Sequence, residues 1–282
     1  MYRCFNLTVQ NGDFFDQPKE YIDECKRIGQ TIKDSLQVKV NEILSAVTNP
    51  DGVIDGANLA ETWFPVECRD VFLSYSHNDE ELAFIVAGIL NKSFGLSVFM
   101  DALAWGSADD LLKGIDDRFC KKSNGSYSYE KRNFSTSHVH SMLTAAIMRA
   151  MDQTEVVLFL NTNNSTYQLA KGFENKHTLS PWIFEEIMLS TVLRRRDWKE
   201  HRKEPTTVLA HYQEKLDVVY PLCLDSFTHI STSDVVEWKQ KWEERKSNIE
   251  SPYGGMLLPT QEKIIHSLNV LYEMKFGVNV RG

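Results

Sequence analysis

Short apolar runs alternate with amphipathic helical patterns along this chain, and that alternation constrains its fold more than any other feature. The expected strands lie at residues 71–76 (VFLSYS), 96–100 (LSVFM), 155–161 (EVVLFLN) and 217–224 (DVVYPLCL). Strands that are apolar almost throughout are typical of a parallel sheet that helices cover on both faces. We therefore predict an α/β fold.

Apolar residues three or four positions apart predict the helices between these strands. They are expected at residues 19–47, from just after Asn78 to about Leu90, at 138–151, at 181–195 and at 260–276. Asn78 and Glu81 have the spacing of a capping box, which predicts the start of the second helix. Residues 49–52 (NPDG) end the first helix, and an irregular segment follows as far as Pro65. The expected division is an N-terminal helical extension, 1–66, and a main domain, 67–282.

Charge and cysteine content limit the partners that we expect. The formal net charge of −8 argues against nucleic acid or an anionic membrane as the main partner, because both favour clustered Lys and Arg. The five cysteines are scattered and form no CxxC pair, so neither a disulfide framework nor a zinc ribbon is expected. No apolar run reaches membrane-spanning length. These features predict a soluble cytoplasmic protein.

A parallel sheet binds ligands at the carboxyl ends of its strands, so a site is expected just after Ser74, Met100 and Leu160. No GxGxxG or GxxxxGK[ST] motif follows any of these strands. A glycine-rich cradle for nucleotide phosphates is therefore not predicted.

Four motifs stand in a fixed order: DVFLSYSHNDEELA, LSVFMD, EVVLFLN and SPWIFEEI. Together they resemble the Toll/interleukin-1 receptor (TIR) domain, over residues 69–224. The resemblance implies a flavodoxin-like parallel sheet flanked by helices. Residues 102–136 form a longer insertion after the second strand than is usual in that family. We expect a long loop there that contains one short helix beginning at Asp109 and Asp110 (DDLLKGIDD). The C-terminal part, 225–282, is expected to be helical and lies outside the match.

The resemblance implies one of two kinds of function, because some TIR domains are self-associating adaptors and others cleave the nicotinamide-ribose bond of NAD⁺. We expect the enzyme, of the bacterial immune or signalling type, with NAD⁺ as its substrate and no other cofactor. Its product would be linear, cyclic or conjugated ADP-ribose, sensed by a downstream effector in anti-phage defence, and the TIR domain would form a homo-oligomer. The alternatives are a non-enzymatic adaptor module and a nucleoside base-exchange enzyme of related fold.

The motif SPWIFEEI supplies the candidate catalytic carboxylate. Ser180 suits the N-cap of a helix and Pro181 its first turn. Trp182 and Glu186 then stand at i and i+4 on one face, whereas Glu185 points about 100 degrees away. The resemblance implies that Glu186 is catalytic and that Trp182 lines the same pocket. The alternative is an ordinary amphipathic helix whose Glu residues face water.

Four further residues are candidates for binding the substrate. Tyr75 and Ser76 follow the first expected strand, and either could contact the sugar or phosphates or serve only as a turn residue. Asp101 ends the second strand, and Trp105 could stack on a base or pack on its own domain.

His138 and His140 form an HxH pair. No third ligand stands near them in the sequence, so no metal site is predicted.

Overall fold

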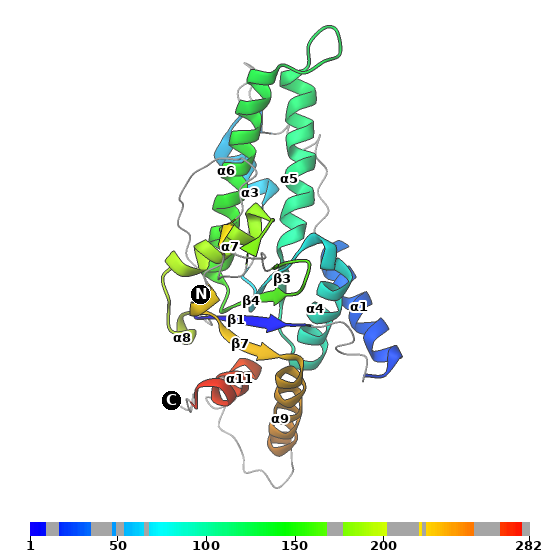
Figure 1. Ribbon diagram of the computed structural model, residues 1–282, viewed down its shortest axis with the longest axis vertical. Helices are drawn as coiled ribbons and strands as arrows, with labels where there is room; N and C mark the ends of the chain where they lie inside the picture. Colours follow the sequence, from blue (N-terminus) through cyan, green and yellow to red (C-terminus); the bar gives the residue numbers. More distant parts are fainter. Residues whose placement is uncertain are drawn as a thin grey trace.

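The computed structural model describes residues 1–9, 17–34, 47–48, 54–64, 68–167, 177–201, 220–221, 224–250 and 266–277. It is an α/β structure in which helices flank a central sheet and a helical hairpin projects from one side (Figure 1). Within these residues, none of the helices combines the length and the apolar character needed to cross a membrane.

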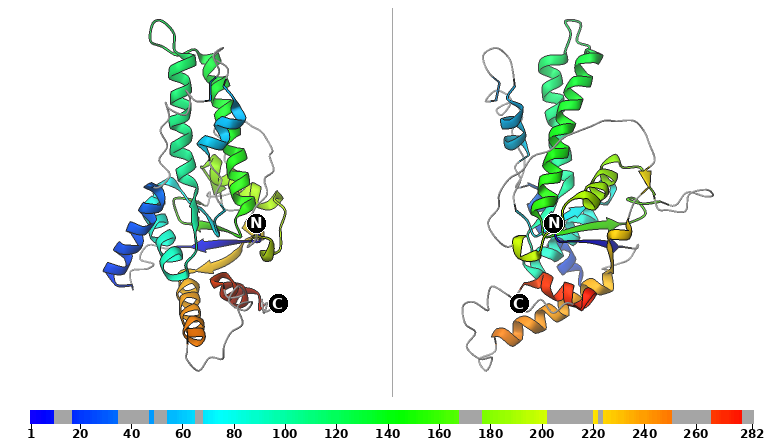
Figure 2. Two further views of the ribbon diagram at one scale, coloured as in Figure 1. Left: turned by 180° about the vertical axis from the view of Figure 1, so that it is seen from behind. Right: turned by 90° about the vertical axis from the view of Figure 1, so that its left-hand side faces the viewer.

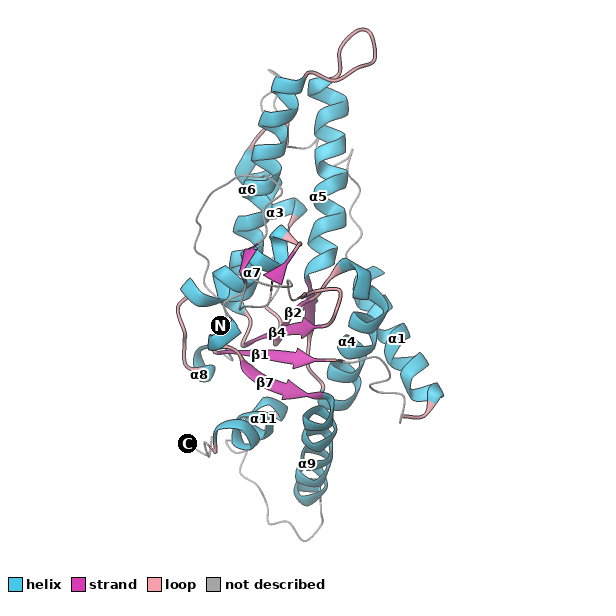
Figure 3. Cartoon of the chain, in the orientation of Figure 1, coloured by secondary structure: helices cyan, strands magenta, loops and turns pink. Residues whose placement is uncertain are grey.

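The central sheet has five parallel strands in the order β3-β2-β4-β1-β7. The strands are β1 (Arg3–Thr8), β2 (Val71–Ser74), β3 (Val98–Met100), β4 (Val156–Asn161) and β7 (Thr228–Ser231). The parallel sheet and three of the four expected strands are confirmed. Of the fourth expected strand, 217–224, the structure describes β6 (Tyr220–Pro221). Its expected place in the parallel sheet is wrong, because β6 pairs antiparallel with β5 (His177–Thr178) in a separate small sheet (Figure 3).

The sheet also contains two strands that the sequence analysis missed. β1 lies inside the sheet, where Phe5 is paired with Leu158 of β4 on one side and with Thr228 of β7 on the other. The description of residues 1–66 as a purely helical extension is therefore wrong, and so is that of residues 225–282 as purely helical. Sequence analysis missed β1 because the strand has no continuous apolar run. Phe5 and Leu7 pack in the core on one face of the sheet, whereas the polar residues Asn6 and Thr8 between and after them stay partly exposed.

Helices cover both faces of this sheet. On one face Phe5, Leu73 and Leu158 pack with α1 (Lys19–Asp34), α4 (Glu80–Phe94), α9 (Thr232–Glu250) and α11 (Ser267–Phe276). On the other face Phe72 and Phe159 pack with α3 (Gly56–Trp63), α5 (Asp101–Ile115), α6 (Tyr129–Gln153) and α7 (Pro181–Val192). A short helix, α8 (Trp198–His201), follows α7.

The N-terminal helix α1 packs closely against α4. The backbones meet at two glycines, since a Cβ on Gly29 would lie 2.2 Å from the Phe84 carbonyl oxygen and one on Gly88 would lie 1.9 Å from that of Cys25. Ordinary side chains at these positions would hold the helices apart, so α1 belongs to the domain itself. Residues 35–46 of the helix expected over 19–47 lie outside the described residues, and Val47 lies in a turn.

The segment expected to be a long inserted loop is a helical hairpin. Helix α5 continues into a π-helical turn, Asp116–Cys120, and α6 returns to the sheet (Figures 1 and 2). Asp116 is buried at this turn, where it accepts hydrogen bonds from Arg132 (2.7 Å) and Ser135 (2.5 Å). The prediction of a loop over 102–136 is wrong because each half of the hairpin buries an apolar stripe, with Leu111 on α5 and Val139 on α6 in the same core.

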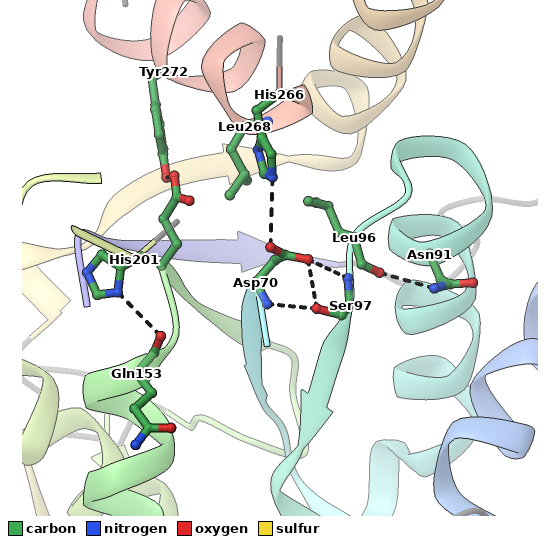
Figure 4. Close-up of polar contacts among 10 residues, drawn as sticks. Asp70, Asn91, Leu96, Ser97, Gln153, His201, His266, Leu268 and Tyr272 are labelled. Carbon is green, nitrogen blue, oxygen red and sulfur yellow. Dashed lines mark hydrogen bonds and ion pairs between the residues drawn. The ribbon is translucent and has the colours of Figure 1, made fainter. Parts of the chain in front are cut away.

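Polar contacts hold the C-terminal helix at the amino end of the sheet (Figure 4). Asp70 accepts hydrogen bonds from the Ser97 amide and hydroxyl, both at 2.7 Å, and His266 Nε2 lies 3.8 Å from its other oxygen. Tyr272 of α11 donates a 2.8 Å hydrogen bond to the buried Glu155. The expected closing helix is confirmed over 267–276. The amino end of the sheet, where these contacts lie, is opposite to the carboxyl edge, where ligands are expected.

Candidate functional site

The carboxyl edge of the sheet has one position where the strand order reverses. From β2 the chain passes through α4 to β3 on one side, whereas β4 lies on the other side of β2. Ligands of open parallel sheets bind in the crevice at such a point. Ser74 ends β2 and Asn161 ends β4 here, so the structure places the expected strand ends together.

Glu186 is buried at this edge. The local sequence places it there, because the Ser180 hydroxyl accepts a hydrogen bond from the Ile183 amide (3.3 Å) and Pro181 opens α7. Ile183 and Ile187 of α7 pack in the core, and Glu186 is buried beside them with only 1% of its surface exposed. The alternative of a water-facing Glu186 is wrong.

The Glu186 carboxylate is held by the end of strand β2. Ser74 Oγ, itself fully buried, donates a hydrogen bond to Glu186 Oε2 at 2.5 Å. A buried carboxyl group costs stability unless it is hydrogen-bonded, so this contact helps to account for its presence in the core. Ser74 was expected only to mark the edge of the site, and its direct contact with Glu186 was not predicted.

Glu185 has a different environment from its neighbour. It is half-buried between α7 and α6, and burial raises the pKa of its carboxyl group, while a hydrogen bond with Thr144 acts in the opposite direction. The two adjacent acids thus face different elements, in agreement with their expected separation around the helix.

Trp182 contacts α6. Its ring lies edge-on to the His140 imidazole, with centroids 5.1 Å apart, and it packs on the same core as Ile183. Glu186 instead accepts a hydrogen bond from Ser74 of β2. These contacts join the two side chains to different elements, and the common pocket that their spacing suggested stays a prediction. His140 is a neighbour of Trp182 that the sequence analysis considered only as a metal ligand.

His138 of the HxH pair is exposed. Within the described ranges, no three His, Cys, Asp or Glu side chains come close enough to hold a metal ion.

A second polar cluster joins the loops after β2 and β4. Asp79, which is buried, accepts hydrogen bonds from Thr162 Oγ1 (2.5 Å) and Asn164 Nδ2 (2.6 Å). Asp79 is also the N-cap of α4 but makes no side-chain cap there, so the expected capping box of Asn78 and Glu81 is wrong. Sequence analysis missed this cluster, although the polar run NTNNST directly after a buried strand was a signal for it.

The remaining candidates have mixed outcomes. Tyr75 is 3% exposed and packs in the core beneath α4. Ser76 begins a turn, and its carbonyl accepts the Asp79 amide at 2.7 Å. Asp101 and Trp105 lie on α5 directly after β3, and their side chains are outside the described part of the structure. Tyr75 and Ser76 therefore have structural contacts at the same strand end as Ser74.

Two cavities lined by described residues lie on the opposite face of the sheet. One is an apolar void of about 20 Å³ among Phe5, Leu158 and Trp238. The other is a more open hollow between α1, α4 and α9, lined by Tyr21, Ile89 and Lys239 among others. Glu186 lines neither cavity.

Comparisons with protein-family models, with curated proteins and with solved structures gave no match to this chain. The TIR resemblance therefore depends on the four sequence motifs.

Proposed function

We propose that this chain is a TIR-type enzyme that cleaves the nicotinamide-ribose bond of NAD⁺, with Glu186 as its catalytic carboxylate. The observation that carries the proposal is the position of Glu186, which is hydrogen-bonded to Ser74 where the strand order reverses. Strands β2, β3 and β4 also support it. Counted from Val71, their order in the sheet matches the 2-1-3 order that begins a flavodoxin-like fold.

One fixed carboxylate is enough for this reaction. Loss of nicotinamide leaves an oxocarbenium-like ribose, whose positive charge a nearby carboxylate stabilises. The nicotinamide of NAD⁺ is already cationic, so its departure needs no general acid. Ser74 fixes one carboxylate oxygen in advance of the reaction, and such preorganisation is the usual source of electrostatic stabilisation in enzymes.

The burial of Glu186 requires a movement during this reaction. Since 1% of the residue is exposed, NAD⁺ reaches the carboxylate only when neighbouring side chains move aside. Substrate binding would therefore be coupled to a local rearrangement at the ends of β2 and β4. The product, an ADP-ribose in linear, cyclic or conjugated form, would then act as the signal for a downstream effector.

The same burial favours a second candidate, a non-enzymatic TIR module that works by self-association. In that case the Glu186–Ser74 hydrogen bond fastens α7 to the sheet and does nothing else. A variant without the carboxylate would then change stability and leave no catalytic trace.

Product analysis of three purified proteins separates these functions: wild type, Glu186→Gln and Glu244→Gln, the last an exposed acid of α9 that serves as the matched control. Each is incubated with NAD⁺ and with a panel of nucleosides, with and without a crowding agent that promotes assembly, and products are identified by mass spectrometry. We expect wild type and control to release nicotinamide and Glu186→Gln to be slower by on the order of a hundredfold or more.

Thermal unfolding of each variant shows whether it is folded under assay conditions. Equal nicotinamide release by wild type and Glu186→Gln refutes the catalytic assignment. A wild type that leaves NAD⁺ intact under both conditions supports the adaptor. Turnover of nucleosides without nicotinamide release supports base exchange.

A further inference from the structure

The crevice at the carboxyl edge of the sheet is closed by hydrogen bonds in this structure. It lies between the loop after β2 and the loop after β4, where the strand order reverses. Asp79 of the first loop accepts hydrogen bonds from Thr162 Oγ1 (2.5 Å) and Asn164 Nδ2 (2.6 Å) of the second. These three residues, which we call the Asp79 bridge, therefore join the two loops across the place where a ligand is expected.

Hydrogen bonds within the second loop hold the two donors in place. The Thr162 hydroxyl accepts hydrogen bonds from the amides of Asn164 (3.1 Å) and Ser165 (3.2 Å), and the Thr162 amide donates to Ser165 Oγ (2.8 Å). Thr166 Oγ1 donates to Asn161 Oδ1 at 2.8 Å, which connects the loop to the last residue of β4. The loop is thus a hydrogen-bonded unit that presents a hydroxyl and an amide to the carboxylate.

The Asp79 bridge lies beyond the strand ends that hold Glu186. Ser74, the donor to Glu186, is fully buried at the end of β2 and is level with Phe159 in β4. Strand β4 continues past that level, and Thr162 follows its last residue. Asp79 follows Ser74 in the chain and is 8% exposed. A ligand that enters between β2 and β4 therefore meets the Asp79 bridge before it reaches Glu186.

We propose that Asp79 is a positioning residue that keeps this crevice closed, and that the Asp79 bridge breaks when a ligand reaches Glu186. Glu186 is 1% exposed, so access to it requires the two loops to separate. Only the open fraction of the protein then binds ligand, and the apparent affinity is reduced by that fraction. The identity of the ligand, NAD⁺, rests on the proposed function, whereas the closure of the crevice does not.

Thiol labelling of a Ser74→Cys protein measures the opening. This substitution exchanges an oxygen for a sulfur at a fully buried position, and iodoacetamide reaches the new thiol only when the crevice opens. Labelled peptides are quantified by mass spectrometry. Cys25, fully buried where α1 meets α4, reports any general loosening of the same molecules. Local opening therefore labels the new thiol faster while the labelling of Cys25 stays the same.

Two adjacent asparagines provide a matched pair of variants in this Ser74→Cys protein. Both are exposed, and Asn164 donates to Asp79. Asn164→Ala should raise the labelling rate of the new thiol by about tenfold or more, because a hydrogen bond to a carboxylate is lost. Asn163→Ala should leave the rate unchanged. Thr162→Val should also raise it, and Thr162→Ser, which keeps the hydroxyl, should restore it. Equal labelling of the two asparagine variants, or an equal rise at Cys25, overturns the proposal.

NAD⁺ kinetics, measured with Ser74 intact, separate a failure of this inference from a failure of the proposed function. Asn164→Ala should lower the KM for NAD⁺ by about the factor that it adds to the labelling rate and keep kcat within about twofold, because more of the protein is open before substrate binds. A contact that only supports the fold would not lower KM. An active enzyme whose KM is not lowered overturns the proposal. Labelling in the expected order without any nicotinamide release refutes the proposed function and supports the closed crevice.

Discussion

Replacement of Gly88 by alanine should push α1 away from α4 and destabilise the fold. The new Cβ would lie 1.9 Å from the Cys25 carbonyl oxygen, whereas ordinary contact begins at 3.4 Å, so the helices must separate by about 1.5 Å. A shift of that size breaks the 2.6 Å hydrogen bond between Tyr21 and Ser93 and opens the packing around Cys25, which is fully buried.

The expected cost follows from three opposing effects. Alanine is more favourable than glycine inside a helix by about 1 kcal/mol. Overpacking against a backbone costs roughly 2–3 kcal/mol, and a lost hydrogen bond costs about 1 kcal/mol. We therefore expect Gly88→Ala to lower the free energy of unfolding by about 2–3 kcal/mol, which for a chain of this size corresponds to a fall in Tm of roughly 3–5 °C.

Urea unfolding of matched glycine variants measures this cost. Gly56→Ala is the control, because its nearest neighbour, Met142 Cε, would be 3.5 Å from the new Cβ, and its stability should change by less than about 0.5 kcal/mol. Gly29→Ala should resemble Gly88→Ala, and the double variant should cost less than the two together, because one displacement of α1 relieves both clashes. A Gly88→Ala protein as stable as wild type would refute the close packing of α1.

Replacement of Asp70 and of Glu185 should change the stability of the protein with opposite dependence on pH. Each effect is measured as the difference in unfolding free energy between variant and wild type. Burial alone would raise the pKa of Asp70, but contacts with His266 and Ser97 outweigh burial and lower the pKa below 3.8. The ionised Asp70 therefore stabilises the fold above pH 3.8, and this stabilisation is lost as the pH falls through the folded-state pKa. Asp70→Asn should therefore destabilise most near neutral pH, and a pH-independent difference would contradict this. Burial raises the pKa of Glu185 above 4.5, so its ionisation opposes folding as pH rises through the folded-state pKa. Glu185→Gln should be more stable than wild type at pH 7 and equal to it below pH 4, and a destabilised variant at pH 7 would count against the burial.

The strands that could be predicted from the sequence are those that helices cover on both faces of the sheet, because such strands are apolar at nearly every position. Strands β2 and β4 are buried at every position, and their sequences VFLS and VVLFLN show it directly. The start of α7 could also be predicted, because Ser180 and Pro181 fix it by local chemistry alone. In such segments the local preference and the final environment agree.

The contacts of the site depend on where distant elements meet, and local patterns do not contain that information. The spacing of Trp182 and Glu186 correctly implied neighbouring positions on α7, yet their partners, His140 and Ser74, come from α6 and β2. Asp79 shows the same limit. Local spacing predicted a capping box from Asn78 and Glu81 and no role for Asp79, whose carboxylate contacts Thr162 and Asn164, more than eighty residues away in sequence. Long-range packing therefore decides what this carboxylate contacts.

The position of β1 determines which part of this chain can fold as a unit. The TIR-like motifs begin at residue 69, yet the fourth position of the sheet, beside β4, is filled by residues 3–8. In the flavodoxin-like order that position belongs to a strand that follows the third one in the chain. Without β1, both β4 and β7 would lose a hydrogen-bonded neighbour, and Phe5 and Leu7 would leave the core. The segment that carries the candidate site is therefore complete only together with the N-terminal strand.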